Sequence, residues 1–186
     1  KVMQSWKKKK LFLPTLEKKK LKYEGKIFHD LHHRSHAAAA FYPSPFKKAA
    51  ILTIDGVGEW ATASIALGEE NKITLLKEMH FPNSLGLLYS AFTQFIGFKV
   101  NSGEYKMMGL APYGNPIYVD VILDKLISIK DDGSIDINQN YFDYLNGSVM
   151  TNKNFADLFG GPNRIPESKI TQREMDIACS LISFNI

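Results

Sequence analysis

A short β-rich run, Ile-Leu-Thr-Ile at residues 51–54, opens the most regular part of the hydrophobic pattern. Such a run, followed at once by glycines, is typical of a buried strand. Residues 62–67 and 72–78 then flank a polar turn that contains glycine, which predicts a hairpin. We therefore expect adjacent antiparallel strands within residues 50–80, with Asp55 at the end of the first strand.

Helical spacing marks three further segments. Alanines between His36 and Tyr42 favour a helix that ends before Pro43. Apolar residues three and four positions apart predict helices over 84–96, with Gly97 suited to the C-terminus, and over 119–127. The order of strand, hairpin and helices predicts a layered α/β or α+β domain.

The other internal segments have less regular patterns. Asp131-Asp132-Gly133 lies between isoleucines, which predicts a small hairpin. Residues 99–116 hold glycines and prolines without a clear period, so we expect a long loop there. Residues 138–169 are rich in Asn and Gly, and they predict irregular structure.

The C-terminal residues predict a helix that has only just begun. Thr171 and Glu174 have the spacing of a capping box, and the apolar stripe after them is still helical in pattern at Ile186. The chain also starts without a methionine. We expect the sequence to be a part of a longer protein.

The composition is that of a globular domain. The chain has 186 residues, of which 45% are hydrophobic and 23% charged, and this balance argues against disorder throughout. No apolar run approaches the roughly 20 residues of a membrane span, and no signal peptide is recognisable. A single cysteine, Cys179, excludes an internal disulfide framework and a multi-thiolate zinc site. We expect a reducing, cytoplasmic setting and no membrane partner.

The net charge of +4 belongs to one end of the chain. Residues 1–26 contain ten lysines against two glutamates, so the rest of the chain is net acidic. We interpret residues 1–25 as a lysine-rich approach segment, which is either an anion-binding arm or a solvated helix face. It lacks arginine and has few aromatic residues, which argues against a nucleic-acid partner.

Two histidines and an aspartate form the first candidate site. His32 and His36 are four residues apart, so on a helix both imidazoles project from one face and can bind one metal ion. Asp55 follows a buried strand, where a carboxylate is costly unless it is paired or coordinated. Two histidines and a carboxylate match a ligand set that leaves open positions for a substrate. The alternative is a pair of surface or capping histidines.

Two glycine-containing loops form the second candidate site. In the run from Asp55 to Glu59, Gly56 and Gly58 would let backbone N–H groups approach phosphate oxygens, although the same pattern occurs in ordinary tight turns. The long loop at 102–114 holds a lysine, a glutamate and three glycines, and loops of this length are often functional.

Three motifs together resemble a known family. His32-His33-Arg34-Ser35-His36-Ala37-Ala38, the run from Ile51 to Glu59 and the loop from Ser102 to Gly114 are similar to the NodU/CmcH carbamoyltransferases. The resemblance covers most of the chain from Lys26 onward, but only a part of the family's length. It implies that residues 26–186 are a partial actin-like carbamoyltransferase domain, truncated at both ends.

The resemblance implies a fold and a reaction. The fold is an α/β, actin-like and sugar-kinase-like ATPase domain of ribonuclease H-like type, with a mixed sheet and flanking helices. A separate domain resembling YrdC makes carbamoyl-adenylate from carbamoyl phosphate and ATP. The actin-like domain passes the carbamoyl group to a hydroxyl of a small-molecule or sugar-like acceptor. Without the adenylate-forming domain, we expect these 186 residues to be inactive alone.

The resemblance also implies roles for particular residues. Positions matching His32, His36 and Asp55 hold a divalent metal, iron in the best-studied type and zinc as the alternative. A further aspartate ligand lies beyond Ile186.

The second set of roles concerns the adenylate and the acceptor. Gly56 and Gly58 would hold the phosphate, and Lys106 is either a phosphate contact or a solvated lysine. His33 is either a general base or a residue that lies behind the metal ligands or on the surface.

Two other functions stay open. A tRNA threonylcarbamoyl transferase shares the paired histidines, but the loop at 102–114 is more similar to the small-molecule family. A catalytically silent fragment that binds nucleotide or metal is the other.

Overall fold

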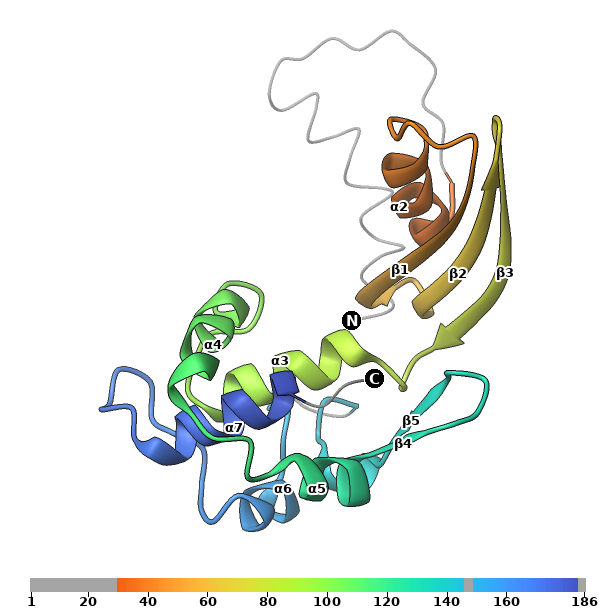
Figure 1. The fold of residues 1–186 in the computed structure, drawn as a ribbon. Helices are drawn as coiled ribbons and strands as arrows, with labels where there is room; N and C mark the ends of the chain where they lie inside the picture. Colours follow the sequence, from red (N-terminus) through yellow and green to blue (C-terminus); the bar gives the residue numbers. More distant parts are fainter. Residues whose placement is uncertain (1–29, 146–148, 184–186) are drawn as a thin grey trace, which may run out of the picture. The chain divides into compact units, whose positions relative to one another are not determined.

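The computed structural model describes residues 30–145 and 149–183 (Figure 1). The chain divides into two compact units, residues 1–81 and residues 82–186. The lysine-rich segment at 1–25 lies outside the described residues.

In the described residues, the first unit begins with a helix. Helix α2, His32–Phe41, starts four residues before the predicted 36–42 segment and ends ahead of Pro43. Its alanines favour helix, and Ala37 and Phe41 are buried on the face that meets the sheet. They form a small apolar core with Ile51, Ala66 and Ile73.

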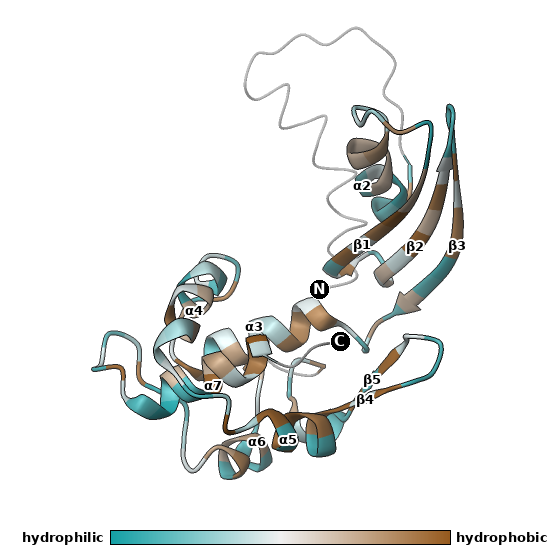
Figure 2. Ribbon diagram, viewed as in Figure 1, coloured by the Kyte–Doolittle hydropathy of each residue, from teal (hydrophilic) through white to brown (hydrophobic). Residues whose placement is uncertain are grey.

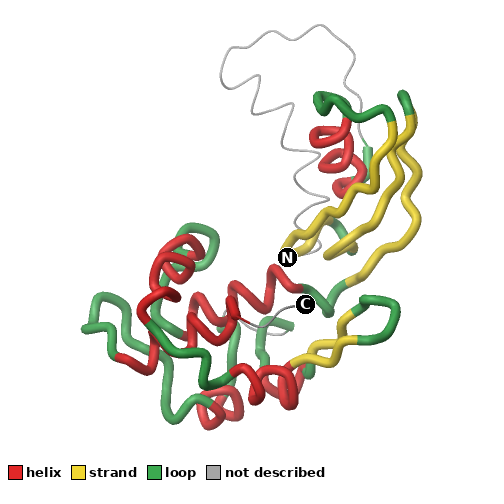
Figure 3. The backbone as a smooth tube through the Cα atoms, in the orientation of Figure 1, coloured by secondary structure: helices red, strands yellow, loops and turns green. Residues whose placement is uncertain are grey.

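A three-stranded antiparallel sheet completes this unit. Its strands are β1 (Lys48–Gly58), β2 (Ala61–Glu69) and β3 (Lys72–His80), in the order β1-β2-β3, and Figure 3 shows them in yellow. The predicted strand and hairpin are therefore confirmed. Apolar residues occupy much of the three strands, and polar residues form the turn between β2 and β3 (Figure 2).

One expectation about the sheet is wrong: Asp55 does not end its strand, because β1 continues to Gly58. Every strand pair in the described residues is antiparallel, as the two-residue turns that join β1, β2 and β3 require, since parallel neighbours need a long crossover. The mixed sheet of the whole domain stays a prediction.

An irregularity in β1 explains where its last residues point. The register is regular up to the pair Ile54–Ala63 and resumes at Gly58–Ala61, so three residues of β1 oppose one residue of β2. Before the irregularity, Ile51 and Thr53 face α2, and Asp55 continues this alternation. The extra residues change the phase, which brings Gly58 into the buried position.

The second unit has an aromatic core. Helix α3, Leu85–Phe95, is capped by the Ser84 hydroxyl, which accepts a hydrogen bond from Leu87 N, and Gly97 follows it with a φ of 82°. This confirms the helix predicted over 84–96. The rings of Phe92 and Phe95 pack on those of residues 155 and 159 at centroid distances of 4.8–5.8 Å among the four.

The other elements of this unit follow α3 along the chain. They are α4 (Glu104–Leu110), the 3-10 helix η1 (Ala111–Tyr113), α5 (Val119–Val121), the π-helix η2 (Ile122–Leu126), β4 (Ile127–Ile129), β5 (Ile135–Ile137), the 3-10 helix η3 (Gln139–Tyr141), α6 (Lys153–Leu158) and α7 (Gln172–Ser183). The second hairpin is confirmed as β4–β5, and the helix expected over 119–127 is α5 followed by the π-helix η2.

The expectation of a loop throughout residues 99–116 is wrong, because α4 lies within it. The Glu104 carboxylate accepts hydrogen bonds from Asn101 N and Gly103 N, so it satisfies donors just ahead of the helix. Gly109 lies inside α4, and its presence hid the helical pattern. Residues 138–169 are likewise not wholly irregular, since they contain α6.

Helix α7 begins with one half of the predicted capping box, the hydrogen bond from the Thr171 backbone to the Glu174 side chain. The buried Glu174 carboxylate accepts from Thr171 N at 2.8 Å and from Thr171 Oγ1 at 2.6 Å. Burial raises the pKa of this carboxyl, but the hydrogen bonds from Thr171 and the contact with Arg173 bring its net pKa below the ordinary value. The ionised form therefore stabilises the fold.

We expect Glu174→Gln to lower the free energy of unfolding by about 1–2 kcal/mol at pH 7. Because the folded pKa is depressed, the contribution of Glu174 is present above the unfolded pKa of about 4.3 and is lost as the pH falls through the folded pKa. Urea unfolding at pH 7 and near pH 3 measures this difference. If the wild type and Glu174→Gln differed in free energy of unfolding by the same amount at both pH values, the prediction would be contradicted.

Candidate metal centre

Helix α2 and strand β1 bring three predicted ligand residues together. His32 and His36 lie one turn apart on α2, and Asp55 faces them from β1. One ligand atom from each lies within 4.8 Å of the other two. His32 Nε2 is 2.6 Å from Asp55 Oδ2 and 2.9 Å from His36 Nε2, and His36 Nε2 is 3.6 Å from Asp55 Oδ2.

These three atoms suit a cation better than a hydrogen-bond network. His32 Nε2 faces two partners that lie in different directions, since the partners are themselves 3.6 Å apart. A ring nitrogen carries at most one hydrogen, and that hydrogen cannot point at both partners. A cation between the three atoms would interact with all of their lone pairs at once.

The separations are also close to those of a ligand set. Ligand atoms about 2.1 Å from a tetrahedral ion lie about 3.4 Å from one another. The observed separations of 2.6, 2.9 and 3.6 Å differ from this by less than about 1 Å, which small side-chain rotations can supply. The donor set therefore fits a divalent metal such as iron or zinc.

Asp55 is held in an ionised state. Its Oδ1 atom accepts a hydrogen bond of 2.6 Å from Gly56 N, which leaves Oδ2 directed at the histidines. Burial raises the pKa of the Asp55 carboxyl, but the Gly56 hydrogen bond and the nearby His32 and His36 outweigh it, so the net pKa is below the ordinary value. The Asp55 carboxyl is therefore ionised at neutral pH, which is the form that a metal ligand needs.

His33 lies apart from the three ligand atoms. Its side chain is 2% exposed and packs between α2 and the sheet, where Nδ1 is 2.8 Å from Thr53 Oγ1 and 3.2 Å from Ser64 Oγ. The two hydroxyls are 2.5 Å apart. Burial lowers the pKa of His33, which favours the neutral ring. This position favours a supporting role over a general base.

The predicted phosphate contacts lie in different surroundings. Gly56 N donates to Asp55, and Gly58 is buried against the rings of His32 and His33. Lys106 is exposed on α4, in the other unit. Phosphate binding by Gly56, Gly58 and Lys106 stays a prediction.

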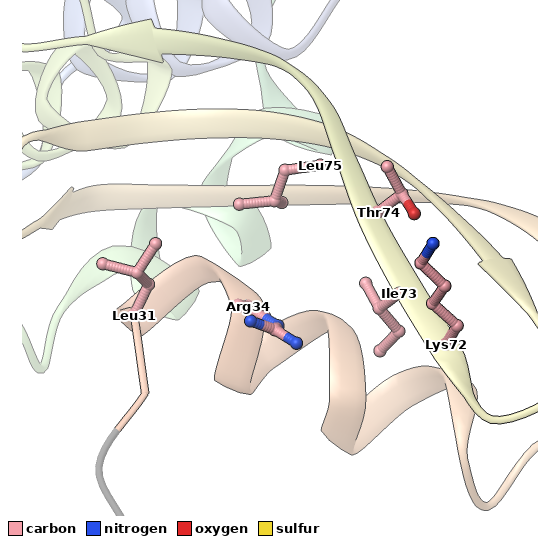
Figure 4. Close-up of a pocket in the computed structure, with 6 residues that line it drawn as sticks. All are labelled: Leu31, Arg34, Lys72, Ile73, Thr74 and Leu75. Atoms are coloured by element: carbon pink, nitrogen blue, oxygen red, sulfur yellow. The ribbon is translucent and has the colours of Figure 1, made fainter.

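A pocket of about 330 Å³ lies elsewhere in the first unit. It is lined by Leu31, Arg34, Lys72, Ile73, Thr74 and Leu75 (Figure 4). The three ligand residues do not line it, so it is separate from the metal centre. None of the described helices is long and apolar enough to span a bilayer.

Comparison with known proteins decides the family. The family model described as "Carbamoyltransferase N-terminus" matches residues 2–185. The chain belongs to this carbamoyltransferase family. It is 58% identical over 187 residues to the uncharacterized protein sll1178 of Synechocystis sp., a match that covers 96% of this chain and 30% of that protein.

Two nodulation proteins are more distant relatives in the same comparison. NolNO of Sinorhizobium fredii is 36% identical over 119 residues, which cover 64% of this chain and 17% of that protein. NolO of Bradyrhizobium diazoefficiens is 35% identical over 102 residues, which cover 55% of this chain and 18% of that protein. The chain thus spans less than a third of the length of these three relatives.

Sequence reasoning missed the residues that hold His33. Thr53 and Ser64 hold His33 from neighbouring strands, at positions that are paired in the β1–β2 register. The alternation of Ile51, Thr53 and Asp55 could have indicated that Thr53 faces the helix. The pairing with Ser64 depends on the irregularity between Ile54 and Gly58, which shifts the register away from the one that the turn sets.

Proposed function

We propose that the protein transfers a carbamoyl group from carbamoyl-adenylate to a hydroxyl of a small-molecule or sugar-like acceptor. The observation that carries this proposal is the convergence of His32, His36 and Asp55 on one point in a chain of the carbamoyltransferase family. Formation of the adenylate from carbamoyl phosphate and ATP is assigned to a part of the polypeptide outside these 186 residues. We do not expect these 186 residues alone to catalyse carbamoyl transfer.

The chemistry of the transfer explains the residue types. The acceptor oxygen forms a bond to the carbamoyl carbon, the bond from that carbon to the phosphate oxygen breaks, and adenylate leaves with the electron pair while the hydroxyl proton passes to a base. A bound divalent ion supplies Lewis acidity toward the mixed anhydride. His32, His36 and Asp55 would hold that ion, and Gly56 orients the carboxylate through its N–H group.

The proposed fold context is an actin-like, sugar-kinase-like ATPase domain. The antiparallel strands β1, β2 and β3 with α2 on one face, and the glycines that follow Asp55, support it. In this context Gly56 and Gly58 would contact the phosphate of the adenylate, and the setting would be cytoplasmic.

Removal of the metal tests the proposed function. The full-length protein that contains this domain is treated with a chelator and supplied with carbamoyl phosphate, ATP and a panel of sugar-like acceptors. We expect carbamoylated product, detected by mass spectrometry, to be lost on chelation and restored by ferrous iron or zinc. Undiminished transfer by protein shown to be metal-free would contradict the proposal.

A further inference from the structure

We propose that Gly58 is a positioning residue for the metal centre, because the absence of its Cβ lets the His32 ring reach the cluster. The proposal rests on the metal site proposed above, but it assigns Gly58 a role that phosphate binding does not require. A Cβ built on Gly58 would lie 2.4 Å from His32 Cδ2, 2.9 Å from His32 Cγ and 2.8 Å from His33 Cδ2.

The space beside Gly58 is set by the irregularity in β1. The extra residues between Ile54 and Gly58 turn Gly58 toward α2, where it is buried. Its φ angle is not in the left-handed region, so the backbone itself accepts an alanine. A substitution would therefore act through contact with the two rings and not through backbone strain.

The contact falls on the central member of the cluster. Carbon atoms pack at about 3.5–4.0 Å, so a methyl group at 2.4 Å would displace the His32 ring by about 1 Å. His32 Nε2 is the atom that lies 2.6 Å from Asp55 Oδ2 and 2.9 Å from His36 Nε2. A displacement of about 1 Å exceeds the roughly 0.5 Å within which the side chains of a binding site must be held.

Gly68 offers a matched control on the neighbouring strand. It is buried, it also has no left-handed φ, and a Cβ there would lie 2.7 Å from three ring atoms of Phe41, which is the last residue of α2. Alanine at either glycine pushes against the same helix. Only Gly58 touches a predicted metal ligand.

The experiment measures metal affinity and thermal stability for Gly58→Ala and Gly68→Ala in the full-length protein. Zn²⁺ is titrated in competition with a chromophoric chelator. We expect both substitutions to lower the melting temperature, and only Gly58→Ala to weaken Zn²⁺ binding, by about 10- to 100-fold as for other groups that orient ligands. Equal affinity of the wild type and Gly58→Ala would overturn the proposal and leave the metal site standing.

A double-mutant cycle tests the same contact without metal. Gly58→Ala is measured alone and in a His32→Ala background, where two of its three close contacts no longer exist. We expect a clearly smaller fall in melting temperature in the second background, with the His33 contact accounting for what is left. Equal falls in both backgrounds would overturn the proposal, even if the wild type bound no Zn²⁺ and the proposed function failed.

Discussion

Substitution of Asp55 by alanine is expected to remove most of the metal affinity of the protein. Asp55 supplies the negative charge of the ligand set, and its Oδ2 atom lies 2.6 Å from His32 Nε2. The loss should exceed the roughly 10- to 100-fold that follows from removing an outer partner of a ligand. Metal content after gel filtration and Zn²⁺ titration measure the effect, and carbamoyl transfer should fall with them.

Two further variants define the cause of this effect. Asp55→Asn keeps an oxygen for the Gly56 hydrogen bond but removes the charge, so it should also bind metal weakly. Glu69→Ala removes a carboxylate of the same sheet that is more than half exposed and paired with Lys48, and it should bind metal normally. Retention of wild-type affinity in Asp55→Ala would show that Asp55 is not a ligand.

Substitution of Phe155 by alanine is expected to give the largest loss of stability in the second unit. Its ring is fully buried and lies 4.8–5.5 Å, between centroids, from the rings of Phe92, Phe95, Phe142 and Phe159. Deleting a buried phenyl ring costs about 3–5 kcal/mol, which is a large share of the roughly 5–15 kcal/mol that stabilises a domain. Urea unfolding, with hydrogen exchange to locate the loosened segments, measures the loss.

Exposed apolar residues of the same unit provide the comparison. Ile165 is 75% exposed, so Ile165→Ala should change the free energy of unfolding by less than about 0.5 kcal/mol. Phe155→Leu retains most of the buried volume, so its loss of free energy of unfolding should lie between those of Ile165→Ala and Phe155→Ala. A Phe155→Ala protein as stable as Ile165→Ala would mean that this ring is not part of the core.

The local pattern predicted much of the first unit. The run at 51–54 and the hairpin after it are strands because alternation and turn residues act over short distances. The pairing of His32 with His36 followed from helical spacing, and the structure places them on one helix with Asp55 opposite. The metal itself stays a prediction.

Features that depend on contacts between segments could not be predicted. The irregularity of β1 appears only in its register with β2, and it decides that Gly58 faces the histidines. Helix α4 depends on Glu104 satisfying donors ahead of it, which its glycine-containing sequence does not reveal. His33 is buried because Thr53 and Ser64 meet beside it, and residues on two strands are brought together only by folding.

The arrangement of α2, β1, β2 and β3 has a consequence for how the protein is made. These elements follow one another in the chain, and each strand pairs with the strand next to it in the sequence. All three candidate ligands lie within residues 32–55. Hairpins form in about 1–10 μs, whereas a ribosome adds about 5–20 residues per second. The helix and the sheet therefore have ample time to bring His32, His36 and Asp55 together while the second unit is still being synthesised.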